Sequence, residues 1–310
     1  LYQGDAEKWL KLAYGLKARY TMHLLKRSAN KDADMEKVLE YVNNSFESAE
    51  EQAAFDVYDA NNINPLYGFF VARAGLGASE SMRSKLAEYN DPRLSRAFIT
   101  KQGTSGKEQA PGTADNAVYA PNGTPEQGTS KYGTSLFMYS ISAPTLLLSY
   151  HELKFLEAEA LCRLERDAKS ALKDAVVAGL LNAENSFTIS RKELGKTLIN
   201  AASSITEAEA ESYFDNTIEA KYTAEPLKTT MTQKYFALWG ASGEATESYN
   251  DVRRMKGLGE NFIELKNPNS FPLRCPYGNS DTTTNAEVKA AYGNGQYVYS
   301  ENVWWAGGSS

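Results

Sequence analysis

The chain has 310 residues, of which 42% are hydrophobic and 23% charged, a composition ordinary for a globular protein that can bury a sizeable core. Its net charge of −6 argues against nucleic acid as a partner, because neutralising phosphates needs clustered Lys and Arg. No run of 18 apolar residues occurs, so the sequence offers no candidate transmembrane helix. Two cysteines, Cys162 and Cys275, define no disulfide framework.

Two helices separated by a short polar turn predict an antiparallel hairpin over residues 4–48. Asp5 stands where it can cap the first helix. The apolar stripe expected on that helix has i, i+3, i+4 spacing and comprises Trp9, Leu12, Ala13, Leu16, Tyr20, His23, Leu24 and Arg27. The stripe of the second helix comprises Met35, Val38, Leu39, Val42 and Phe46. We expect His23 to be a hydrogen-bonded packing residue and not a metal ligand.

Residues 50–143 differ in composition from the first hairpin, because they are rich in Gly, Pro and Asn. A short helix precedes Pro92, and the stretch from 101 to 135 contains six Gly and three Pro without lasting periodicity. A loop this long inside a folded chain is usually functional or disordered. We therefore predict a loop-rich region here.

Helical periodicity returns over residues 144–257, beginning with the sequence HELKFLEAEALCRL at 151–164. Its His-Glu start resembles a zinc-protease helix, but such a helix needs a second His four residues on, where Phe155 stands. We therefore predict a packing helix, with Glu152, Glu157 and Arg163 in solvent. The stripe predicted for the next helix comprises Leu172, Val176, Gly179 and Leu180.

Three further helices are expected in this region, at 206–222, at 225–240 with Pro226 in its first turn, and at 243–257 with Gly257 as C-cap. The remainder, 258–310, is predicted as a closing loop region with one short helical piece. The expected fold class is mostly α, a single domain over 1–310 built from tetratricopeptide-like helical hairpins that carry long irregular loops.

Several stretches resemble, in order, the segments of one known family. They are WLKLAYGLKARYTMHL, NINPLYGFF, YNDPRLSRAF, HELKFLEAEALCRL, the pair MTQKYFALWG and EATESYNDVRRMKGLG, PLRCPYGNSDTTTN and the final ENVWW. Each match is weak alone, but together they resemble the SusD-like (SusD/RagB) outer-membrane lipoproteins of the Bacteroidetes, in the branch called starch-binding associating with outer membrane.

The resemblance implies a cell-surface glycan-binding lipoprotein that delivers oligosaccharide to a SusC-like TonB-dependent transporter in the outer membrane. It implies no catalysis and no cofactor. Family members normally begin with a signal peptide, a lipid-carrying Cys and another helical region, so we expect that amino-terminal part, lipid anchor included, to be absent from this chain.

Sugar binding needs flat aromatic faces beside Asn, Asp, Arg or Gln, and two stretches offer them. The first lies within 61–73 and comprises Asn61, Asn62, Tyr67, Phe69 and Arg73. The second lies in the Gly-rich loop and comprises Asp115, Tyr119 and Tyr132. The alternative for the first group is that Tyr67 and Phe70 plug the loop onto the helical core.

Two other functions stay open at this point. Stacked helical hairpins can form a protein-interaction scaffold without sugar affinity, in which case the 101–135 loop would be dispensable. A glycoside hydrolase would need two carboxylates about 5–10 Å apart across a cleft. Glu157 and Glu159 do not qualify, because residues two apart on a helix point to different faces.

Overall fold

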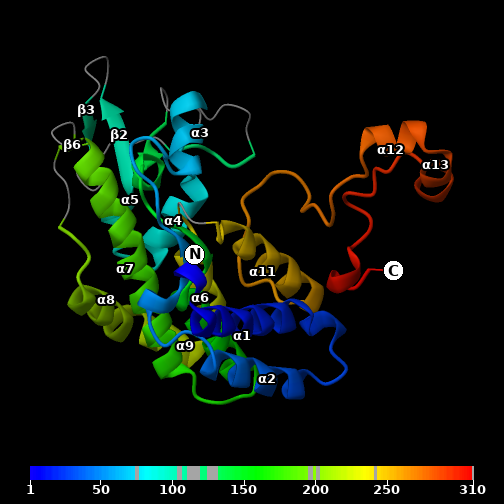
Figure 1. Cartoon of the computed structure of the whole chain (residues 1–310), viewed down its shortest axis with the longest axis horizontal. Helices are drawn as coiled ribbons and strands as arrows, with labels where there is room; N and C mark the ends of the chain where they lie inside the picture. The colour runs from blue at the N-terminus through cyan, green and yellow to red at the C-terminus, as the bar shows by residue number, and fades with distance from the viewer. Residues whose placement is uncertain are drawn as a thin grey trace.

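The computed structural model describes residues 1–73, 77–102, 107–109, 119–123, 132–194, 198–199, 203–240 and 243–308. The mostly helical fold expected from the sequence is confirmed (Figure 1). The longer helices are α1 (Ala6–His23), α2 (Lys31–Asn43), α6 (Tyr150–Arg163), α7 (Lys169–Leu194), α10 (Pro226–Ala237) and α11 (Ala245–Leu258). The shorter ones are α3 (Pro65–Arg73), α4 (Glu80–Glu88), α5 (Arg93–Ala97), α8 (Glu207–Tyr213), α9 (Glu219–Ala224), α12 (Asn279–Thr284) and α13 (Ala286–Tyr292).

Helix α6 is the centre of the arrangement, because it contacts α1, α2, α7 and α10. Its start is fixed by Ser149, whose hydroxyl accepts a hydrogen bond from the backbone of Glu152 at 3.0 Å. Helices α1 and α2 form one antiparallel hairpin, and α6 and α7 form another. Among the residues that the structure describes, every helix is too short or too polar to span a bilayer.

The strands are short. β1 (Ala53–Phe55) pairs with β5 (Thr145–Leu148) in an antiparallel ribbon beside α1, and Ala53 stands opposite Leu148. A second sheet has the order β4-β2-β3-β6, formed by Thr134–Ser135, Phe98–Gln102, Lys107–Gln109 and Leu198–Ile199. Helices α12 and α13 lie to one side of the helical body, near the C-terminus (Figure 1).

Helix α1 begins as predicted but buries a different face. Asp5 caps it, accepting hydrogen bonds from the backbone of Glu7 and Lys8. The buried residues are Leu12, Gly15, Ala18, Arg19 and Met22. Trp9 is 47% exposed, and Tyr20 and Leu24 are also exposed. The predicted stripe was wrong in part: Leu12 is buried as expected, but Gly15 and Ala18 also face the neighbouring elements, where their small side chains let the backbones approach closely.

Helix α6 also corrects the sequence prediction. Glu152 and Arg163 were expected in solvent, yet Glu152 is fully buried and the Arg163 side chain is nearly so. Arg19 donates to both carboxylate oxygens of Glu152, and Arg163 donates to Glu159 at 2.8 Å. These charged residues are buried because each has a partner of opposite charge, Arg19 of α1 for Glu152, and both Glu159 on the same helix and Glu260 after α11 for Arg163.

Three smaller predictions concern the last helices. Pro226 does stand in the first turn of α10, as expected. The helix predicted at 206–222 is confirmed from Glu207 to Ala224, and a π-helical turn, Phe214–Ile218, lies inside it between α8 and α9. The C-cap of α11 is Gly259, with φ of +82°, and not Gly257. A left-handed conformation is favourable for glycine, which has no Cβ to collide with the carbonyl.

Candidate functional site

The sequence-predicted group at 61–73 lies at and before α3. Asp59 folds the preceding turn by accepting hydrogen bonds from the backbone of Asn61 and Asn62 at 2.8 and 2.7 Å. Phe69 is 51% exposed and Tyr67 is half-buried. Phe70, in contrast, is buried against Tyr139 at 5.0 Å between ring centroids, so it is the residue that plugs this segment onto the core. Arg73 is the last residue of α3, and its side chain lies outside the described part.

Of the second predicted group, the structure describes Tyr119 and Tyr132. Asp115 lies outside the described residues. Tyr119 packs edge-on against Phe98 at 5.4 Å, with the Arg83 guanidinium over its ring, and burial raises the pKa of its hydroxyl. Tyr132 is buried. Both tyrosines are therefore held by protein contacts, and none of the predicted residues lines the cavities described below.

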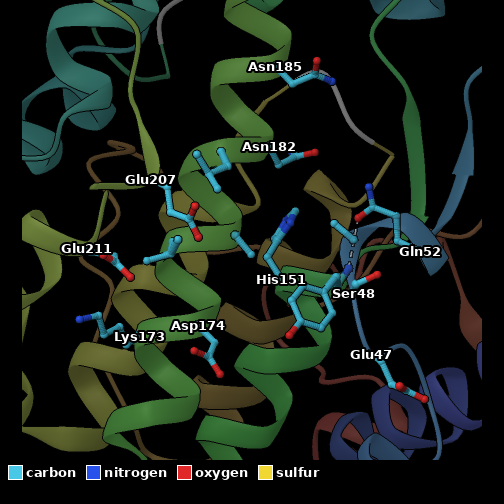
Figure 2. Close-up of a pocket in the computed structure, with 15 residues that line it drawn as sticks. Glu47, Ser48, Gln52, His151, Lys173, Asp174, Asn182, Asn185, Glu207 and Glu211 are labelled. Carbon is cyan, nitrogen blue, oxygen red and sulfur yellow. Dashed lines mark hydrogen bonds between the residues drawn. The ribbon is translucent and has the colours of Figure 1, made fainter. Parts of the chain in front are cut away.

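A cavity of about 500 Å³ opens where α6, α7 and α8 meet the turn 47–52, and we call it the hairpin cavity (Figure 2). Its volume is within the range of about 300–1,000 Å³ usual for ligand pockets. One face of α7 forms its longest wall, contributing Lys173, Asp174, Val177, Ala178, Leu181, Asn182 and Asn185. These positions recur at intervals of one and three residues, which is the period of a single helical face.

Apolar and polar groups occupy different parts of this cavity. Tyr150, Ala49, Val177, Ala178 and Leu181 supply its apolar surface. Asn182 and Asn185 project from α7, with Glu207 and Glu211 toward one end and Ser48 and Gln52 toward the other (Figure 2). Such a division suits a ligand that has both an apolar face and a rim of hydroxyl groups.

The amides of Asn182 and Asn185 are available to a ligand. No hydrogen bond or ion pair joins either side chain to another described residue. Because they are three residues apart, they lie on the same side of α7. Each amide offers two N–H donors and one carbonyl acceptor, a set that matches neighbouring hydroxyls of a sugar.

His151 lies at the base of the cavity and is 2% exposed. Burial lowers the pKa of its imidazole to about 4, so the ring is neutral near pH 7. Its Nε2 lies 3.8 Å from Oε2 of Glu244. Burial, together with the nearby Glu152 carboxylate, raises the pKa of Glu244 well above its ordinary value. Both Glu152 and Glu244 face Arg19, and one guanidinium cannot neutralise two buried carboxylates.

These two groups make opposite contributions to stability in mild acid. The stability contributed by His151 is present above about pH 6.5 and is lost as the pH falls toward 4, because the unfolded chain binds the proton there. The stability contributed by Glu244 is present below its unfolded pKa of about 4.5 and is lost as the pH rises through the raised folded pKa. Between those limits the two effects offset each other.

We expect Glu244→Gln to remove the Glu244 contribution and expose that of His151. The free energy of unfolding of the variant should then fall more steeply than that of the wild type between pH 6.5 and 4.5, because the opposing Glu244 contribution is gone. Urea unfolding at four pH values across this window measures the difference. Parallel pH profiles for the two proteins would contradict this assignment.

The carboxylates that line the hairpin cavity are either paired with lysines or exposed. No group of three His, Cys, Asp or Glu within the described residues could hold a metal ion. Glu47 is paired with Lys11 at 2.9 Å, and Asp174 lies 3.4 Å from Lys154. Glu207 and Glu211 are exposed, whereas the general acid of a glycosidase sits in apolar surroundings that hold its proton.

This cavity was not predicted from the sequence. The predicted stripe of α7 lies on its buried face, and the cavity lies on the adjacent face. The signal is present in the sequence, because Val177 and Leu181 form a second apolar pair at i, i+4 that the core stripe does not include. Asn182 and Asn185 follow on the same side. An apolar strip that continues into unpaired amides is the pattern that could have identified it.

Fold and cavity together define a helical-hairpin protein with an open, ligand-sized site. The chain belongs to the SusD-like_2 family, described as starch-binding associating with outer membrane, which matches it over residues 1–277. No curated protein matches it.

Solved structures agree with this membership. A SusD/RagB family protein from Bacteroides thetaiotaomicron has 66% sequence identity and a TM-score of 0.94 over 100% of this chain. A SusD homolog from Bacteroides fragilis has 19% identity and a TM-score of 0.69 over 97% of this chain, and covers 67% of its own length. A chitin-binding protein, also at 19% identity and a TM-score of 0.69, matches 98% of this chain and 66% of its own length. The chain likewise spans 66% of the length of the B. thetaiotaomicron protein.

Proposed function

We propose that this protein is a non-catalytic, surface-exposed glycan-binding protein of the outer membrane. It captures oligosaccharide and passes it to a partner TonB-dependent transporter of the SusC type, and a lipid anchor holds the full-length protein at the membrane. Membership in a family described as starch-binding and outer-membrane-associated is the observation that carries the proposal.

We propose the hairpin cavity as the site of capture. Its apolar surface can receive the C–H face of a pyranose, and Asn182 and Asn185 can pair with the hydroxyls on its edge. The lining carries four carboxylates, those of Glu47, Asp174, Glu207 and Glu211, against one lysine. This excess of negative charge favours a neutral glycan over one that carries carboxylate or sulfate groups.

The exposed residues before and on α3 are the second proposed contact. Asn61, Asn62, Tyr67 and Phe69 present amides beside partly exposed rings, which is the chemistry expected from the sequence. They line no described cavity, so we propose them as a surface that a longer glycan touches.

The test is a glycan array probed with the purified wild type and three variants. The Asn182→Ala/Asn185→Ala double variant should lose about tenfold in affinity, because each lost hydrogen bond contributes about 0.5–1.5 kcal/mol. Asn43→Ala, an exposed asparagine on α2 that does not line the cavity, is the matched control and should bind like the wild type.

Tyr67→Ala/Phe69→Ala is the third variant and separates the two proposed surfaces. A loss confined to this variant would move the site to α3. If a sample that unfolds cooperatively binds no glycan at all, the proposal is wrong and a protein-interaction scaffold remains. Release of reducing sugar from any bound glycan would contradict the non-catalytic assignment.

A further inference from the structure

We propose that a second cavity is an independent binding site for a neutral saccharide, an inference that rests on the proposed function. This cavity, which we call the asparagine groove, has a volume of about 570 Å³. It is formed by the end of α11, the segment 261–272 and Tyr299. It shares no lining residue with the hairpin cavity, so the two can be occupied separately.

Three polar side chains of the groove have no hydrogen-bond partner among the described residues. Asn261, Asn269 and Ser270 line it, and no hydrogen bond joins their side chains to another described residue. Amides and hydroxyls both donate and accept hydrogen bonds, as sugar hydroxyls do. The groups therefore match a saccharide edge without requiring a particular protonation state.

Two aromatic rings border these polar groups. Tyr299 is 59% exposed, and its ring packs on no other ring in the described part of the chain. Phe271 is fixed in orientation, because the Tyr249 ring packs against it in a tilted arrangement, with 5.6 Å between centroids, and the Lys256 ammonium lies 5.2 Å from its centroid. An exposed tyrosine beside a held phenylalanine provides the apolar surface that a pyranose ring covers.

The segment that builds the groove is anchored from several sides. The carbonyl of Pro272 accepts a hydrogen bond from the Tyr249 hydroxyl at 3.1 Å. The backbone of Leu273 donates to Val298 at 2.7 Å, which holds the segment near Tyr299. In the middle of the segment, the side-chain amide of Asn122 donates to Asn267 at 3.3 Å. A groove fixed in this way needs little ordering when a ligand binds.

The charges of the groove select a neutral ligand. Among the described residues, only two charged ones line the groove, Glu264 and Lys256, and each contacts another side chain. Glu264 accepts a hydrogen bond from Lys266 at 2.5 Å, and the ammonium of Lys256 lies over the Phe271 ring. With one acidic and one basic residue, the groove wall has no net charge to attract an ionic glycan, whereas a neutral hexose chain finds three polar side chains and two rings.

Two separate sites on one molecule change how it binds a polymer. Once one site holds a polysaccharide chain, the second site meets nearby sugar units at a high effective concentration. Retention by a polymer should therefore exceed the affinity for a short oligosaccharide. Loss of either site should remove that excess and leave the other site able to bind.

The experiment uses the whole protein and a neutral glycan identified on the array, as a short oligosaccharide and as the polymer. Four proteins are compared: wild type, Tyr299→Ala/Asn269→Ala, the Asn182→Ala/Asn185→Ala variant, and Tyr20→Ala as the control for removing an exposed tyrosine. Calorimetry gives the stoichiometry with the oligosaccharide, and affinity electrophoresis gives retention by the polymer.

We expect two oligosaccharides per wild-type molecule, one per molecule of the Tyr299→Ala/Asn269→Ala variant, and at least about tenfold weaker polymer retention by that variant. Tyr20→Ala should behave like the wild type. A stoichiometry of one in the wild type, with retention unchanged in Tyr299→Ala/Asn269→Ala, would overturn this inference while leaving the proposed function intact. Absence of glycan binding in the wild type would overturn both.

Discussion

Replacing Arg254 by methionine should lower the free energy of unfolding by about 3–5 kcal/mol. Arg254 is 1% exposed and its guanidinium donates to Glu159 at 2.5 and 2.8 Å and to Asp251 at 2.7 Å. Methionine fills most of the volume but supplies no charge. Glu159 and Asp251 would then remain buried with less compensation, and an uncompensated buried charge is costly.

Urea unfolding of the wild type and the Arg254→Met variant measures this effect. The matched control is Arg166→Met, which breaks the ion pair with Glu36 on the surface, where both side chains are about half exposed. An exposed pair of this kind contributes less than about 1 kcal/mol. Equal losses in the two variants would show that burial does not determine the strength of these ion pairs.

Replacing Gly15 by valine should destabilise the protein by about 1–3 kcal/mol or more through overpacking. A Cβ placed at this position would lie 2.3 Å from Cδ2 of Leu148 and 2.8 Å from the hydroxyl of Ser45. Leu148 is fully buried, so it has little space into which to move. The added side chain would push α1 away from Leu148 and therefore from the β1–β5 ribbon. Because α6 begins two residues after β5, its packing against α1 would also be disturbed.

The control for this substitution is Ala13→Val on the exposed side of the same helix. It introduces the same β-branched residue and should cost only a few tenths of a kcal/mol, through helix propensity alone. Thermal unfolding of both variants makes the comparison. If Gly15→Val were as stable as Ala13→Val, the close approach of α1 to Leu148 would be contradicted.

The helical architecture could be predicted because periodicity and end signals are local. Asp5 and Pro226 mark helix starts through contacts within one turn, so the sequence alone identifies them. Which face of α1 is buried could not be predicted in the same way. Large apolar residues are usually buried, but in α1 the small residues Gly15 and Ala18 are also buried. Their burial depends on which elements pack against α1 in the folded chain.

The buried charges of α6 show a second limit of sequence reasoning. Glu152 and Glu159 look like solvated residues in an amphipathic pattern, and their partners Arg19 and Arg254 are 133 and 95 positions away. No local pattern reveals such pairs. The hairpin cavity is a mixed case, because the face of α7 that lines it has a local signal in the sequence. The meeting of that face with α6, α8 and the turn 47–52 occurs only in the folded chain. The residues proposed near α3, which include Tyr67 and Phe69, stay a prediction.

The most direct test of the account is a calorimetric titration of the wild type and of Asn182→Ala/Asn185→Ala with one short neutral oligosaccharide. The account predicts saturable binding by the wild type, about tenfold weaker binding at the hairpin cavity in the variant, and an intact ligand recovered afterwards. Identical titrations for the two proteins, or no heat of binding from a folded wild type, would contradict it.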